Sequence, residues 1–101
     1  MDTLNNELQN VIRVLEQISD HAGAHSDAVY ELLDQLYQQK MDLNIATPHA
    51  AAPNYKPAME AMRAAAGKVK AAQRDKNRLA EALRAVSEAT GKLNRVLDNA
   101  A

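Results

Sequence analysis

The sequence contains no cysteine, no tryptophan and no phenylalanine, and each absence narrows what the chain can be. Without cysteine, neither a disulfide framework nor a thiolate metal ligand is possible. With three tyrosines as the only aromatic residues, the apolar content is Ala, Leu, Val, Ile and Met, most of which favour helices over sheets. Three glycines, three prolines and 47% hydrophobic residues argue against disorder. The composition therefore predicts a single all-α domain over residues 1–101.

Long apolar runs and catalytic motifs are also missing. No segment approaches the roughly 18 apolar residues of a membrane span, and the opening MDTLNNELQ has neither the basic nor the apolar block of a signal peptide. There is no nucleophile paired with a base, no glycine-rich phosphate loop and no motif of paired acids. We therefore expect a non-enzymatic protein without a cofactor, cytoplasmic and free of membrane contact, with export by a signal-free route left open.

Apolar residues recur at alternating steps of four and three, first from Leu4 to Leu43 and then again in the second half of the chain. Between the two patterns, the segment IATPHAAAPNYKP holds all three prolines, which cannot all belong to one helix. The spacing predicts helices at about 3–45 and about 57–99, joined by a connection at about 46–56.

Folding the chain back at the proline segment brings the two apolar patterns into register. Leu4 then faces Leu97 at one end, Leu15 faces Val86 in the middle, and every layer between them receives a residue from both helices. The sequence therefore predicts a long antiparallel two-helix hairpin, coiled-coil-like in its packing. Each helix would be about 60 Å long at 1.5 Å per residue.

The stretch SDHAGAHSD at residues 19–27 leaves two alternatives for the first helix. A break at Gly23 would normally lose the apolar phase, yet the spacing is the same before and after it, which favours one continuous helix. The alternative is a helix that ends near Gly23 and restarts at Ser26, which gives a three-helix bundle. In the continuous hairpin His25 faces Lys76, so we expect these two residues to form a buried polar layer that sets the register.

His21 and His25 also have the spacing that two metal ligands on one helix face require. Two ligands do not make a zinc site, and the only further candidates are Glu16, Asp20 and the distant His49. We therefore expect no metal site.

Charge is divided between the two halves of the chain. Residues 1–50 carry eight acidic against two basic residues, and residues 51–101 carry ten basic against five acidic. In the second half, four cations recur on one outward stripe: Arg63, Lys70, Arg74 and Arg78. Such a basic stripe can follow a phosphate backbone, so nucleic-acid binding is the alternative function. The acidic residues of the first half favour pairing of the two charged faces between molecules.

A second, mostly apolar stripe flanks the first apolar pattern. Its four large members are Ile12, Tyr30, Leu33 and Tyr37. A two-helix hairpin buries one stripe per helix and would leave this one in water, where an apolar patch marks an interface. The core of such a hairpin is also small against an ordering cost of about 1–2 kcal/mol per residue. We therefore expect self-association through this stripe, giving a homodimer that is a four-helix bundle.

The segment PAMEAMRAAAGKVKAA combines small residues with adaptable methionines near the expected tip of the hairpin. The plain interpretation is an Ala-rich helix. The functional interpretation is a docking surface for a partner helix, lined by Ile45, Tyr55, Met59 and Met62. The sequence thus favours a protein that acts through protein–protein contact, as an adaptor, chaperone or regulator, with the protein partner unidentified.

The overall plan resembles the short secreted helical hairpins that dimerise into four-helix bundles. Those proteins carry a Trp-x-Gly turn, and this chain has no tryptophan. The plan also resembles, in outline, small helical antiactivators, secretion chaperones and needle-type subunits. Because this is a likeness of shape, it does not determine a function.

Overall fold

The computed structural model describes residues 3–46 and 53–100, and these residues are helical throughout apart from short turns, with no strand among them. Two short 3-10 turns, η1 and η2, separate the α-helices within each half of the chain. The elements in order are α1 (Leu4–Ser19), η1 (Gly23–His25), α2 (Ser26–Ala46), α3 (Tyr55–Arg74), η2 (Lys76–Arg78) and α4 (Leu79–Ala100).

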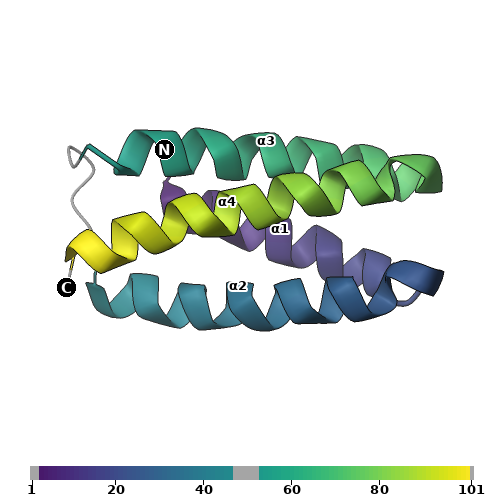
Figure 1. Cartoon of the computed structure of the whole chain (residues 1–101), viewed down its shortest axis with the longest axis horizontal. Helices are drawn as coiled ribbons and strands as arrows, with labels where there is room; N and C mark the ends of the chain where they lie inside the picture. Colours follow the sequence, from purple (N-terminus) through teal and green to yellow (C-terminus); the bar gives the residue numbers. More distant parts are fainter. Residues whose placement is uncertain (1–2, 47–52, 101) are drawn as a thin grey trace.

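The four helices pack side by side as a bundle that measures 38 × 20 × 20 Å (Figure 1). The chain forms two helical hairpins, α1–α2 and α3–α4, and these lie against each other through α1 with α3 and α2 with α4. The consecutive helices α2 and α3 therefore occupy diagonal positions of the bundle. Because η1 and η2 lie at the same end of the bundle, α1 runs parallel to α3 and α2 runs parallel to α4.

The prediction of two continuous helices at about 3–45 and 57–99 is wrong, because each half of the chain turns back on itself. The first helix ends after Ser19, and Gly23 has a φ of 56°, a left-handed conformation that residues with a side chain adopt at a cost. The alternative with a break near Gly23 placed this turn correctly. It missed the second turn, and the expected connection at about 46–56 lies partly outside the described residues.

The second turn is built by the side chain of Asp75. Asp75 leaves the helical conformation, with φ −140° and ψ 104°, and its Oδ1 accepts a hydrogen bond of 3.0 Å from the backbone N–H of Asn77. An Asp that satisfies a free N–H in this way is a strong signal for a helix start. Lys76 and Asn77 belong to the 3-10 turn that follows, and α4 begins at Leu79.

The core of the bundle draws on all four helices. The residues that the spacing of four and three selects are buried, apart from His25 and Lys76 at the turns and the half-buried Leu97. The largest fully buried side chains are Leu4, Leu8, Val11, Ile12, Leu15, Val29, Leu36, Met62, Val69, Val86 and Leu93. A helix of a four-helix bundle faces two neighbours and so buries a wider stripe than a helix of a two-helix hairpin.

The wider stripe explains what happens to the predicted self-association surface. Ile12 and Leu33 retain only 2% and 5% of their accessible surface, because both belong to the core that the four helices of the chain enclose. Two of the four large residues that pointed to a second copy are thus buried within one chain, while Tyr30 and Tyr37 remain exposed. Dimerisation stays a prediction. Because Ile12 and Leu33 are buried, they no longer argue for it.

Candidate functional site

The outer face of α2 carries a stripe of exposed apolar side chains. Tyr30, Tyr37, Met41 and Ile45 are 52%, 41%, 59% and 82% exposed, and they are the large hydrophobic residues exposed among those the structure describes. Their separations of seven, four and four residues place them on one face of the helix. We call these four residues the α2 apolar stripe. Only its tyrosines belonged to the predicted self-association stripe, and Ile45 belonged to the predicted docking surface.

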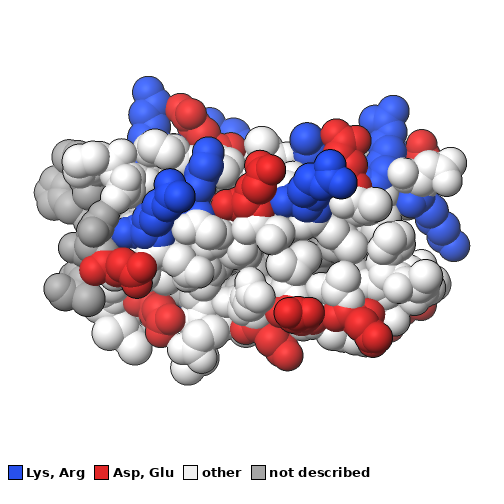
Figure 2. Space-filling model, viewed as in Figure 1, with Lys and Arg blue, Asp and Glu red and all other residues white. Residues whose placement is uncertain are grey.

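Acidic residues lie beside the α2 apolar stripe, along one side of it. Asp27, Glu31 and Asp34 are exposed and Asp42 is half-buried, and the red atoms along α2 in Figure 2 show this acidic edge. Lys40 is the one basic residue of α2, and its Nζ donates to Gln9 Oε1 on α1. The stripe therefore lies in a region of negative charge.

Tyr37 connects the stripe to α1. Its hydroxyl donates a hydrogen bond of 2.6 Å to Glu16 Oε2. This bond exists only while the phenol is protonated, so it raises the pKa of Tyr37 above its ordinary value, and burial and the charges of Glu16 and Asp34 act in the same direction. The contact therefore links α2 to α1 at the surface.

The other predicted docking residues are placed differently. Met62 is fully buried, and Tyr55 and Met59 are half-buried against the core. The Tyr55 hydroxyl accepts a hydrogen bond of 3.1 Å from the backbone N–H of Leu4, which is one of the donors that the start of α1 leaves free. These three residues therefore pack against the core of the bundle, and Met62 is buried there and is not exposed to a partner.

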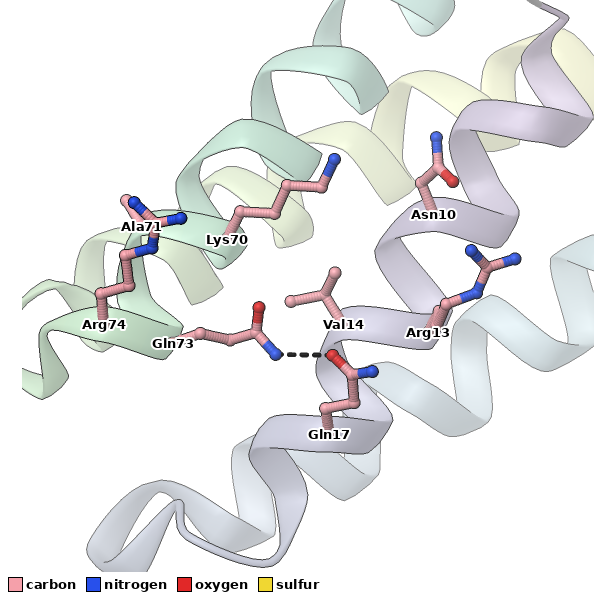
Figure 3. A pocket seen from close by; sticks show the side chains of 8 residues that line it. All are labelled: Asn10, Arg13, Val14, Gln17, Lys70, Ala71, Gln73 and Arg74. Carbon is pink, nitrogen blue, oxygen red and sulfur yellow. Dashed lines mark hydrogen bonds between the residues drawn. The ribbon is translucent and has the colours of Figure 1, made fainter.

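A second feature is a groove between α1 and α3, with a volume of about 470 Å³. Three cations lie along it, Arg13 from α1 and Lys70 and Arg74 from α3, with no acidic residue in its lining. Figure 3 shows Lys70 extending from α3 towards α1, between the other two cations in this view. The lining residues are Asn10, Arg13, Val14, Gln17, Lys70, Ala71, Gln73 and Arg74.

The structure divides the predicted basic stripe into two kinds of residue. Arg63 lies 3.5 Å from the buried Glu7, and Arg78 lies 3.5 Å from Asp75, so two of its four cations take part in ion pairs. Lys70 and Arg74 have no ion pair or hydrogen bond within the described residues and line the groove instead. A continuous basic track along α3 is therefore absent.

The predicted polar layer of His25 and Lys76 is also wrong. Both residues are exposed, because η1 and η2 are turns at the end of the bundle and not the middle of a long hairpin. The buried polar contact lies elsewhere: Gln39 Nε2 on α2 donates to the Thr90 carbonyl oxygen at 2.9 Å and to Asn94 Oδ1 at 2.8 Å on α4. In the sequence, Gln39 and Thr90 occupy positions of the four-and-three spacing that are otherwise mostly apolar, and this was the available signal.

Among residues 3–46 and 53–100, no group of three or more His, Cys, Asp or Glu side chains is arranged to hold a metal ion, and His49 lies outside these residues. Each helix in this part of the chain is too short or too polar to cross a membrane. No protein-family model matches the chain, and comparisons with curated proteins and with solved structures find no match either.

Proposed function

We propose that this chain is a non-enzymatic interaction protein that binds a protein partner through the α2 apolar stripe, and that the partner presents a basic amphipathic helix. One observation carries the proposal: the large hydrophobic side chains exposed among the described residues all lie on one face of one helix. Exposed apolar residues scattered over a surface need no explanation, whereas a contiguous set is typical of an interface.

The shape of the stripe favours a helical partner. Tyr30 and Ile45 are about 22 Å apart along the helix axis at 1.5 Å per residue. Spacings of seven and four residues are those with which one helix packs lengthwise against another. Tyrosine supplies a large, rigid contact at such interfaces, and Met41 adapts to the shape of its neighbour.

The charge around the stripe favours a basic partner. Asp27, Glu31, Asp34 and Asp42 line the same helix, while Lys40 is bound to Gln9. A helix with lysine or arginine beside its apolar face would place opposite charges next to these carboxylates, and would be attracted to them before contact. An acidic helix would be repelled from the same surface.

The alternative function, nucleic-acid binding along the second half of the chain, has less support. It required Arg63, Lys70, Arg74 and Arg78 to act together, and two of these cations are held by acidic residues of the same chain. No aromatic residue lies in the groove that the other two line, so there is no platform on which a base would stack.

Two synthetic helical peptides with the same apolar face test the proposal. One has lysines on the flanks of that face and the other has glutamates, and binding of each fluorescently labelled peptide is followed by anisotropy. We expect the basic peptide to bind and the acidic peptide not to. The double variant M41S/I45S should weaken binding about tenfold or more, since it removes two apolar contacts.

The control variant is Gln35→Ser, on the same helix but outside the stripe, and it should bind as the unchanged protein does. Equal binding of both peptides would contradict the charge argument. Unchanged binding by M41S/I45S would contradict the choice of surface.

A further inference from the structure

The groove between α1 and α3 contains cations that lack acidic partners among the described residues, in contrast to the other cations of α3. On α3 the three cations outside the groove all have an acidic partner: Lys56 with Glu60, Arg63 with Glu7 and Lys68 with Glu81. The two inside it, Lys70 and Arg74, have no such partner among the described residues. Arg13, the single cation of α1, has no acidic partner within residues 3–46 and 53–100 and lies on the same groove.

We infer that this groove binds a compact phosphate-rich anion, a diphosphate or triphosphate group, through Arg13, Lys70 and Arg74. Like charges that share a groove repel one another, and an anion placed between them replaces that repulsion with attraction. Arginine guanidinium groups form paired hydrogen bonds with phosphate oxygens, and a lysine ammonium contributes a point charge. The groove offers both kinds of group from two facing helices.

The geometry favours a small anion over an extended one. Lys70 and Arg74 are one helical turn apart, about 6 Å along the axis, and the lining of α1 from Asn10 to Gln17 spans about 10 Å. At one end, Gln73 Nε2 donates a hydrogen bond of 2.6 Å to Gln17 Oε1 and bridges the two helices (Figure 3). Two or three linked phosphates fit this length, whereas a nucleic-acid strand would extend past it on both sides.

The remaining lining also favours phosphate over a base or an acidic helix. Asn10 and Gln17 add amide groups that can donate to phosphate oxygens, while Val14 and Ala71 are small. An acidic helix would need a broad apolar surface to pack on, and a base would need an aromatic ring. Neither is present in the groove, so charge and hydrogen bonds are what it offers a ligand.

The test is a titration of the isotope-labelled protein with inorganic pyrophosphate, followed by the NMR shifts of its backbone amides. We expect the amides of residues 10–17 and 70–74 to shift together and to saturate. The variant K70E/R74E should bind at least about tenfold more weakly, because each lost charge-assisted hydrogen bond contributes about that factor. Both side chains are exposed, so the variant should fold, and its circular dichroism spectrum checks this.

The matched control is K92E/R95E, which changes the net charge equally but on exposed residues of α4 outside the groove. It should keep the affinity of the unchanged protein. Equal weakening in both variants, or shifts spread over the basic residues generally, would overturn the site. A single-stranded oligonucleotide that binds through the same amides more tightly than pyrophosphate, with a steep salt dependence, would overturn the compact anion in favour of nucleic acid. These outcomes do not depend on peptide binding by α2.

Discussion

The two hairpins of the bundle make the same shape with different chemistry. The α1–α2 hairpin turns at Gly23, whose backbone adopts a positive φ, and the α3–α4 hairpin turns at Asp75, whose carboxylate holds the next N–H. The first turn depends on a residue without a side chain. The second depends on a hydrogen bond that a side chain accepts from the backbone. The comparison shows that two unlike local signals can produce equivalent reversals.

The two hairpins also differ in the size of their buried side chains. The buried residues of α1 and α2 are mainly Leu, Ile and Val, while four of the six buried residues of α3 are alanines. Small side chains allow α3 and α4 to approach closely along their length, and these two helices make the most extensive contact of the bundle. The first hairpin is held by large side chains and the second by close approach.

The largest changes in stability are expected from one core substitution in each hairpin. Leu15→Ala in α1 should lower the free energy of unfolding by about 3 kcal/mol, because it leaves a cavity at a fully buried position. Ala65→Leu in α3 should lower it by about 1–3 kcal/mol, because it adds atoms at a fully buried position. Denaturant unfolding measures both.

A neutral or stabilising Ala65→Leu would show that α3 and α4 are less closely packed than the comparison requires. The exposed Ala64→Leu is the control, since it adds the same atoms to the same helix outside the core.

The turns give effects of intermediate size. Gly23→Ala should destabilise by about 1–2 kcal/mol, because a side chain disfavours the left-handed conformation, although no neighbouring atom lies within 4 Å of the added Cβ. Asp75→Ala should cost about 1 kcal/mol through the lost hydrogen bond to Asn77. Thermal unfolding of both variants measures these costs.

The matched control for Gly23 is Gly67→Ala, within α3, which should stabilise by up to about 1 kcal/mol. A Gly23→Ala variant that is as stable as Gly67→Ala would mean that the first turn does not need the positive φ.

The smallest effect concerns pH and the first hairpin alone. The pKa of Tyr37 is raised in the folded protein, so its stabilising hydrogen bond to Glu16 is fully present below the unfolded pKa of tyrosine and is lost as pH rises through the folded value. The variant Tyr37→Phe should therefore lose less stability between neutral and alkaline pH than the unchanged protein does. Unfolding measured across that range detects the difference, which should be small because the side chain is substantially exposed.

The variant Tyr37→Phe also tests the hydrogen bond between Tyr37 and Glu16 directly. Subtracting its ultraviolet absorbance titration from that of the unchanged protein isolates the ionisation of Tyr37. A difference curve at or below the ordinary tyrosine pKa would contradict the hydrogen bond to Glu16.

The sequence by itself determined the helical class and most of the core positions. Leu8, Leu15, Val29 and Leu36 lie on the predicted face and are buried, because steps of four and three residues place side chains on one side of a helix whatever it packs against. The low aromatic content argued against a sheet-rich fold, and the absence of cysteine excluded a disulfide framework.

Only the tertiary structure decided where the chain reverses and which charges are paired. The spacing from Ala22 to Val29 is one heptad in a straight helix, and the same spacing also suits two helices that turn one face to a common core. An apolar period reports which residues face inward and carries no information on the direction of the chain. For the same reason the four cations of the basic stripe looked equivalent, until α1 supplied Glu7 to Arg63 and formed with α3 the groove that Lys70, Arg74 and Arg13 line.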